Sequence, residues 1–421
     1  MWHNSRRGFN LIRSRANARN NKLKRLELAV IGTLIVLVSG FAIYGTYSVV
    51  TASKGKEVAS NNIEENASVD IYSEKEVIEK AEESKKQNDN TDIEGNIEIN
   101  QEEIVEPEQV VENMKITALG EIMMVGSNWT SNSYSLAFKE IAAYSEKSDY
   151  TVASLATNIT SLADLSDTKS KYIANENIVN AFSALGIDGL NIATDHMLDF
   201  SRNVFDKTIQ ILKNNEIKVI GLENDIVYAE KNGIRVAIIG INNVVIGSAR
   251  DYIDAGIYIY NLEKLRNSIV EARTKADTVI VMTHYGKENV NQVTDVMRWF
   301  AREIVKAGAD IVLGGHSLGL YPVEEYDGKL IIYSLGYLMH DTSKEAGKKS
   351  AIFDIIVNVE GEIEEVTMIP TYIQNKNTVK LYKDINQNTC NKFLHDLKNS
   401  SELSNYTSTI EEQKLVIKLN K

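Results

Sequence analysis

Between residues 114 and 373, short apolar runs alternate with segments in which apolar residues recur every three or four positions. The short runs are bounded by polar or glycine-containing turns and predict buried strands. They are KITALGEIMMV (115–125), YTVASLATNI (150–159), IDGLNIAT (187–194), IKVIGL (217–222), IRVAIIGI (234–241), DTVIVMTH (277–284), ADIVLGGH (309–316) and KLIIYSLG (329–336). The segments with helical spacing are 176–186, 205–216, 262–276 and 294–308. This alternation predicts an α/β domain with largely buried sheets.

The pattern changes after the last of these runs. Residues 351–373 alternate between apolar and polar positions and predict a hairpin at one edge of a sheet. Residues 374–421 are polar, with sparse apolar positions. We expect this last segment to be a weakly structured tail or an accessory helical piece, outside a domain that spans 114–373.

The N-terminal part has a third pattern. Residues 1–25 contain eight Lys or Arg residues and no acidic residue, and residues 28–50 contain no charged residue. A bilayer core of roughly 30 Å needs about 20 helical residues, so this run is long enough to span it. A cleaved signal peptide has a shorter apolar core, and a buried core helix would need partners that this isolated run lacks. The pattern predicts a cytoplasmic segment at 1–27, a transmembrane helix at 28–50 and an extracellular main domain, hence a single-pass cell-membrane protein.

Composition narrows the remaining possibilities. Residues 51–113 are rich in Glu, Asn, Ser and Lys and poor in aromatic residues, which predicts a disordered acidic stalk. The whole chain of 421 residues has a net charge of -12, which argues against a nucleic-acid partner. Cys390 is the single cysteine, so no disulfide can form within the chain.

Polar residues with metal-binding chemistry occur where several predicted strands end. They are Glu121, Asp195 with His196, His284 with Glu288, and His316. In open α/β sheets, ligands bind at the carboxyl ends of the strands. Carboxylates and imidazoles that meet there are typical ligands of a divalent metal ion. Taken one at a time, each of these residues could equally be a hydrogen-bonded loop residue, and composition alone leaves both interpretations open.

The same stretches resemble motifs of the CapA family, poly-gamma-glutamate capsule synthesis proteins that are similar to calcineurin-like metallophosphatases. GEIMM (120–124) stands where the family has GDIML, SLATNIT (154–160) where it has NLETPLT, and ATDHMLDFS (193–201) where it has ANNHALDYG. THYGKE (283–288) stands for HWGxE, and GGHSLGLYPVEEYDGKLIIYSLGYL (314–338) for the long block that ends in YSLGNF. The resemblance covers about 115–373 and implies a four-layer α/β/β/α sandwich with its site at the strand ends.

The resemblance also implies roles for individual residues. Metal ligands would be Glu121, Asp195, His284 and His316, and His196 would be a general acid oriented by Asp199. Glu288, which is also retained, would contribute to binding.

Two departures from the family motifs limit the number of ions. Ala156 stands where the family has a Glu, and Leu318 stands where it has a His. Two metal ions about 3.5–4 Å apart need a bridging ligand, which a methyl group cannot supply, and leucine cannot ligate at all. We therefore expect at most one divalent ion (Mn, Zn or Fe), or none.

Three functions remain open. The family resemblance implies a role in synthesis, release or anchoring of poly-gamma-glutamate or another anionic envelope polymer, with capsule-synthesis membrane proteins as partners. A catalytically degenerate scaffold or polymer-binding protein is the second hypothesis, and the missing ligands favour it. The third, a single-metal phosphoesterase-like hydrolase, rests on similarity of fold alone. Trp129, Tyr134, Tyr144 and Tyr150 could line a carbohydrate or polymer groove, although core packing explains them equally well.

Overall fold

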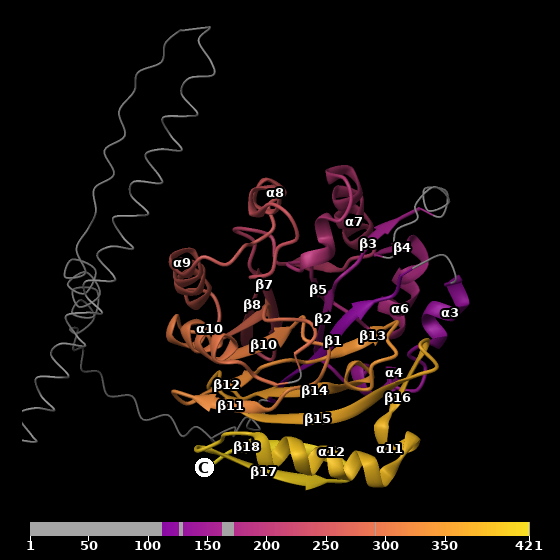
Figure 1. Ribbon diagram of the computed structural model, residues 1–421. Coiled ribbons are helices and arrows are strands. Elements are labelled where there is room, and N and C mark those ends of the chain that lie inside the picture. Colours follow the sequence, from indigo (N-terminus) through magenta and orange to yellow (C-terminus); the bar gives the residue numbers. More distant parts are fainter. Residues whose placement is uncertain (1–111, 126–128, 162–171, 291, 421) are drawn as a thin grey trace, which may run out of the picture. The chain divides into compact units, whose positions relative to one another are not determined.

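The computed structural model describes residues 112–420, apart from 126–128, 162–171 and 291 (Figure 1). The predicted cytoplasmic segment, the predicted transmembrane helix and nearly all of the predicted stalk lie outside the described residues. Within the described part of the chain, no helix is both long enough and apolar enough to cross a membrane.

The larger sheet is mixed and has ten strands among the described residues. Its main path runs β17-β18-β15-β14-β1-β2-β5-β6, with β13 also paired to β1 and β16 to β15. The strands are β1 (Met114–Met123), β2 (Tyr150–Leu155), β5 (Gly189–Asn191), β6 (Lys218–Ile220), β13 (Tyr337–His340), β14 (Lys349–Val357), β15 (Ile363–Gln374), β16 (Thr378–Leu381), β17 (Tyr406–Glu411) and β18 (Lys414–Leu419). Strand β1 is parallel to β2 and β13 and antiparallel to β14.

The smaller sheet has six strands in the order β11-β12-β10-β9-β8-β7. They are β7 (Val227–Lys231), β8 (Ile234–Asn242), β9 (Thr278–His284), β10 (Ile311–Gly315), β11 (Val323–Tyr326) and β12 (Lys329–Ile332). Strands β8, β9, β10 and β12 are parallel to their neighbours in this group, so several carboxyl ends meet at one edge. A separate pair is formed by β3 (Asn158–Thr160) and β4 (Ile173–Asn175).

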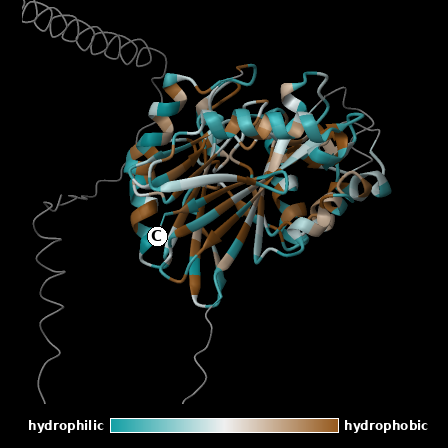
Figure 2. Cartoon of the chain, turned by 90° about the horizontal axis from the view of Figure 1, so that it is seen from below, coloured by the Kyte–Doolittle hydropathy of each residue, from teal (hydrophilic) through white to brown (hydrophobic). Residues whose placement is uncertain are grey.

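The two sheets face each other, and helices cover their outer faces. One apolar core joins Ile116 and Val152 of the larger sheet to Ile238 and Ile280 of the smaller one. A second core lies between the larger sheet and the helices α3 (Ser131–Leu136), α6 (Val179–Ala184) and α7 (Arg202–Asn214). A third lies between the smaller sheet and α9 (Leu262–Arg273) and α10 (Asp295–Lys306). Figure 2 shows the apolar strands inside and polar residues on the surrounding helices. The predicted α/β class is confirmed, with two sheets packed face to face and helices on their outer faces.

The helices over the smaller sheet begin where their sequences favour it. Asn261 caps α9 by accepting a hydrogen bond from the backbone of Lys264, and Thr294 caps α10 in the same way through Met297. Each helix has an acidic residue in its first turn and a basic residue in its last turn, which complements the helix dipole. These local signals explain why both helices were predictable from the sequence.

Of the two expectations for the C-terminal residues, the accessory helical piece is closer than the weakly structured tail, although strands are present as well as helices. After β16 these residues form α11 (Tyr382–Ile385), α12 (Gln387–Ser400) and the β17–β18 hairpin, and β18 pairs with β15. On α12, Cys390, Leu394 and Leu397 are buried in the core that the two sheets share. The expected boundary at residue 373 falls inside β15, so the segment is an accessory part of the same sheet.

Candidate metal centre

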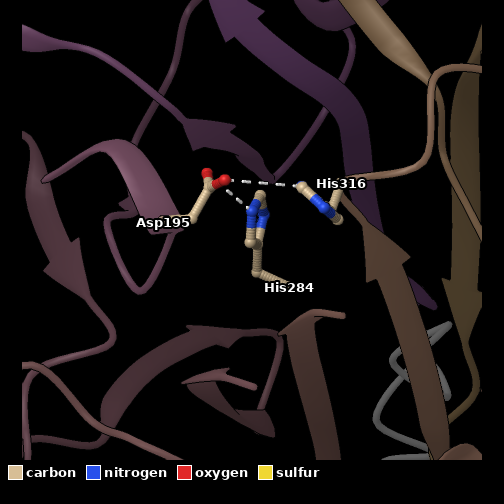
Figure 3. A group of neighbouring side chains, drawn as sticks. All are labelled: Asp195, His284 and His316. Carbon is tan, nitrogen blue, oxygen red and sulfur yellow. Dashed lines mark hydrogen bonds and ion pairs between the residues drawn. The ribbon is translucent and has the colours of Figure 1, made fainter. Parts of the chain in front are cut away.

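The candidate site lies where strands of both sheets end. Glu121 is near the end of β1, and Asp195 begins the short 3-10 helix η3 (Asp195–Leu198) that follows β5. His284 is the last residue of β9, and His316 directly follows β10. The structure therefore brings together four residues that the sequence placed at separate strand ends. Figure 3 shows the side chains of Asp195, His284 and His316 turned toward one another.

Short distances connect this cluster. Asp195 Oδ1 lies 3.0 Å from His284 Nε2, and Asp195 Oδ2 lies 3.8 Å from His316 Nδ1. The rings of His284 and His316 have centroids 4.5 Å apart. Glu121 Oε2 lies 3.1 Å from His284 Nδ1 and accepts a hydrogen bond of 3.3 Å from the backbone of His316. One ligand atom from each of Asp195, His284 and His316 lies within 4.8 Å of the others.

The backbone holds these residues in unusual positions. His316 has a φ of 76°, in the left-handed region that costs a non-glycine residue roughly 1 kcal/mol or more. Gly120 lies so close to β13 that a Cβ atom there would be 2.5 Å from the carbonyl oxygen of Gly336. The hydroxyl of Tyr252 donates to the carbonyl of Asp195 and holds the turn that presents its carboxylate. Such constraints are common where a fold must aim side chains at a ligand.

Several buried polar atoms of the cluster lack a hydrogen-bond partner among the described residues. They are Glu121 Oε1, His284 Nδ1 and His316 Nδ1. His284 Nδ1 lies 3.1 Å from Glu121 Oε2 but outside good hydrogen-bonding geometry, so the attraction between these two groups is mainly electrostatic. A buried polar group without a partner costs about 1–3 kcal/mol. Because His284 Nδ1 has Glu121 beside it, the atoms with unused capacity to bind a ligand are Glu121 Oε1 and His316 Nδ1.

A divalent ion fits this donor set. Two ligand atoms each about 2.1 Å from an ion in tetrahedral geometry lie roughly 3.4 Å apart. The two separations involving Asp195, 3.0 Å and 3.8 Å, bracket that value. Two imidazoles with carboxylate oxygens suit zinc, iron or manganese. Asp195, His284 and His316 can therefore hold one ion, with Glu121 beside them.

The protonation of the cluster follows from its burial and charges. Burial alone would raise the pKa of Glu121 and Asp195, but the adjacent His284 brings the pKa of both carboxyls below their usual range. Burial would lower the pKa of His284, yet Glu121 and Asp195 raise it to about 10. Burial, together with the charge on His284, lowers the pKa of His316 to about 4. The positively charged form of His284 is therefore favoured between the two carboxylates.

His196 lies beside the cluster with Asp199 behind it. His196 Nδ1 is 2.8 Å from Asp199 Oδ2, and His196 Nε2 is 3.7 Å from Asp195 Oδ2. Its ring stacks on Tyr172, with centroids 3.9 Å apart. Burial would lower the pKa of His196, but Asp199 and Asp195 raise it above its ordinary value. This arrangement can hold a proton at the edge of the site.

The positions where family ligands are missing form an apolar cluster. Met123, Ala156, Leu318 and Tyr337 are buried against one another, with Val125 and Tyr172 packed at the side. Within this cluster, Ala156 and Leu318 offer no atom that could bind a cation. The cluster therefore contains both residues, Ala156 and Leu318, that stand where the family has a ligand.

Two further polar residues, Glu288 and His340, lie outside the group of three candidate ligands. Glu288 follows β9 in a half-buried loop, where its backbone carbonyl accepts a hydrogen bond from Leu318 and its carboxylate accepts one from Asn289. It is not part of the three-residue ligand group. Sequence reasoning missed His340, which ends β13, lies 4.8 Å from the ring of Tyr337 and has a buried, unpartnered Nδ1 within the described structure. Its position directly after the YSLGYLM stretch was the only available signal.

The fold and this site together define an α/β protein in which three residues at strand ends, Asp195, His284 and His316, could hold a metal ion. The family model of "Bacterial capsule synthesis protein PGA_cap" matches residues 115–342, and the chain belongs to this family.

Relatives were found in several bacteria. The "Capsule biosynthesis protein CapA" of Bacillus anthracis is 29% identical over 342 residues, which cover 76% of this chain and 81% of that protein. The "PGA biosynthesis protein CapA" of Bacillus subtilis is 30% identical over 42% of this chain and 49% of that protein. A "Probable polyglutamine synthesis accessory protein" of Mycobacterium tuberculosis is 26% identical over 48% of this chain and 58% of its own length. A solved structure, TT1561 of Thermus thermophilus, matches 57% of this chain and 94% of its own with 11% identity and a TM-score of 0.34.

Proposed function

We propose that this protein acts in the synthesis, release or anchoring of an anionic capsule polymer of the poly-gamma-glutamate type, and that it does so with one divalent ion. The family and the names of its relatives support the polymer class. The observation that carries the ion is the converging group of Asp195, His284 and His316 with its unpartnered buried atoms. The predicted transmembrane run would anchor the domain at the outer face of the cell membrane, near capsule-synthesis membrane proteins.

A bound divalent ion would offset the repulsion between this acidic site and an anionic polymer. The chain is acidic overall and the site contains two carboxylates, so a polyanion would be repelled without a cation. A divalent ion on Asp195, His284 and His316 would attract a carboxylate or a carbonyl oxygen of the polymer. When bound, such an ion supplies Lewis-acid polarisation of that oxygen.

The remaining residues have separate tasks. Asp199 accepts a hydrogen bond at His196 Nδ1, which leaves Nε2 on the side of Asp195. His196 would hold a proton at Nε2 near an oxygen bound at the ion. The apolar cluster of Met123, Ala156, Leu318 and Tyr337 shields one side of the site from water.

A non-catalytic polymer-binding role is the second candidate. Ala156 and Leu318, both in the apolar cluster, stand where the family has ligands, so a bridged pair of ions would lack two of its ligands. Binding through one ion needs neither His196 nor Asp199. The two candidates therefore predict different results for variants of those residues.

The test combines metal analysis of the full chain with polymer measurements in cells. We expect about one divalent ion per chain in the unmodified protein and less than about a tenth of that in Asp195→Asn. The substitution replaces a negatively charged carboxylate with a neutral amide, which binds a divalent ion more weakly. The matched control Asp206→Asn, on an exposed α7 side chain, should keep its ion. Cells that carry Asp195→Asn should lose surface polymer. Full metal loading and normal polymer in this variant would contradict the proposal.

His196→Gln distinguishes the two candidates. If the site is catalytic, this variant should keep its ion but lose polymer synthesis or release. If the site only binds polymer, both should remain.

Membrane anchoring has its own test. Protease added to intact cells should remove the domain while an N-terminal tag stays protected, because the basic flank is expected inside. Protection of the domain would refute the proposed location.

A further inference from the structure

A cavity of about 380 Å³ is lined in part by Met123, which lies two residues beyond Glu121 in β1. It is bounded by the end of α3, by β1 and β13, and by the turn between β15 and β16. The backbone of Val379 donates to the carbonyl of Ala137, which fixes α3 against that hairpin. Figure 1 shows α3 beside the β15–β16 hairpin.

The cavity is continuous with the apolar cluster of the site. Met123 and Val125 line the cavity and also belong to or pack against the cluster that contains Ala156 and Leu318. Met123 is two residues beyond Glu121, which corresponds to roughly 7 Å along a strand. A ligand in the cavity would therefore lie close to a group bound at the ion, with apolar surface between them.

The lining has two chemically distinct parts. One wall is apolar and consists of Met123, Val125, Trp129, Leu136, Ala137 and Met339. The exposed rim contains Asp341 and Lys376, whose side chains are 63% and 57% exposed and whose charged groups form an ion pair of 2.8 Å. The other polar groups are largely engaged, since Ser133 caps α3 with Thr130 and the hydroxyl of Thr378 donates to Asn377.

This division discriminates between ligand classes. Trp129 already stacks one ring face on Tyr134, and the hydroxyl groups of a sugar ring would meet methionine, valine and leucine, which offer no partners among the described lining residues. An apolar side chain matches that wall, and methionines adapt to its shape. The rim carries one positive and one negative group side by side, which matches the ammonium and carboxylate of one amino acid.

The geometry points to a second ligand site in this cavity, which takes an apolar amino acid through its side chain, its ammonium group at Asp341 and its carboxylate at Lys376. This site goes beyond the proposed function, because it requires neither the ion nor a reaction. Its ligand class is a leucine- or phenylalanine-like amino acid rather than the acidic units of the proposed polymer.

The test is a ligand-detected NMR titration of the full chain in detergent micelles with EDTA present. Leucine and phenylalanine should bind saturably, and both should bind more tightly than glutamate, N-acetylglucosamine and hexanoate. Because the chelator removes divalent ions, a negative result here would leave the proposed metal function unaffected.

Two variants and their matched controls locate the binding. Lys376→Gln removes the carboxylate partner at an exposed position and should weaken leucine binding by up to about fivefold, the factor that corresponds to an exposed ion pair. Leu136→Asp changes a wall residue that is 58% exposed, so folding should tolerate it, and should weaken binding at least about tenfold. Lys392→Gln and Val359→Asp are exposed changes outside the cavity and should leave binding unchanged.

Several outcomes would overturn the assignment. Absence of saturable leucine and phenylalanine binding would refute it. Tighter binding of the sugar would make the cavity a carbohydrate site. Equal binding of hexanoate would show that the ammonium group has no partner, and unchanged affinity in Leu136→Asp would place the ligand elsewhere.

Discussion

At the scale of single residues, chemical type and position at strand ends were enough to indicate the cluster. Glu121, Asp195, His284 and His316 come from four separate segments, and the structure brings them within a few ångströms. The sequence also indicated that Ala156 and Leu318 cannot ligate. It could not show that these two side chains pack with Met123 and Tyr337, because that contact depends on how β1 meets β13.

Ala156→Glu should destabilise the protein. Ala156 is fully buried in the apolar cluster, so the new carboxylate would lose its hydration without gaining a partner. We expect a loss of about 3 kcal/mol or more in the free energy of unfolding, measured by urea denaturation in EDTA. The control Ala249→Glu, at an exposed position in α8 (Ala249–Asp254), should change it by less than about 0.5 kcal/mol. A free energy of unfolding equal to that of the unmodified protein would show that water reaches the side chain at position 156.

Adding Leu318→His to Ala156→Glu should change the number of bound ions. The pair supplies a carboxylate and an imidazole on the side of Glu121 that is now apolar. We expect metal analysis to rise from about one ion per chain toward two, and the added ion to recover part of the lost stability. Unchanged metal content would show that this backbone no longer positions a second site.

At the scale of elements, a buried carboxylate joins α10 to the smaller sheet and to the C-terminal segment. Glu324 on β11 accepts hydrogen bonds from Arg298, Arg302 and the hydroxyl of Tyr333. Arg298 also pairs with Glu402, at 3.1 Å, in the loop after α12. The network connects four separate elements, and no local sequence pattern indicated it.

Glu324→Ala should weaken this part of the fold strongly. The substitution leaves two arginines and a tyrosine hydroxyl without their shared partner, so we expect a loss of about 3–5 kcal/mol in the free energy of unfolding. The comparison is Glu402→Ala, whose side chain is 60% exposed and whose loss should cost less than about 1 kcal/mol. Similar losses of unfolding free energy in both variants would show that the buried carboxylate of Glu324 stabilises the fold no more than the exposed one of Glu402.

Cys390 on α12 reports how firmly that helix is packed. Its side chain is fully buried, and burial raises the pKa of the thiol to about 11. The folded state therefore favours the neutral thiol. The stability that this thiol contributes is fully present below the pKa of the unfolded chain, about 8.5, and is lost as the pH rises from there through about 11. Alkylation by iodoacetamide at pH 9 should be slow in the native protein and complete in urea. Rapid native labelling would show that α12 opens easily.

Elements with a continuous apolar run or a regular apolar face were predicted better than the others. Strands β8, β9 and β10 and helices α7, α9 and α10 match their predicted segments, because each buries an apolar face of regular period. The predicted strand at 150–159 is divided at Leu155 into β2 and β3, which belong to different sheets. Strands β7, β11 and β13 have only four or five residues and owe their form to pairing with neighbours, which sequence periodicity does not register.

At the scale of the whole molecule, the sequence indicated the α/β class and the family but not the extent of the domain. The C-terminal segment looked polar because α12 exposes most of its surface and buries only three positions, Cys390, Leu394 and Leu397. The hairpin of β17 and β18 completes an edge of the larger sheet, a long-range pairing that local composition does not reveal. The protein therefore needs residues well beyond 373 to close its core.

Limited proteolysis of the full chain tests this extent. We expect early cleavage between about residues 51 and 113, where composition predicts a stalk, and a resistant core that retains residues up to about 420. A chain that ends at residue 374 should lose cooperative unfolding, because it leaves the β15 edge unpaired and exposes the apolar surface that Leu394, Leu397 and Ile417 now cover. The control is removal of residues 1–111, which should leave cooperative unfolding intact. A resistant fragment that ends near residue 373 would show that the C-terminal segment is dispensable for the core.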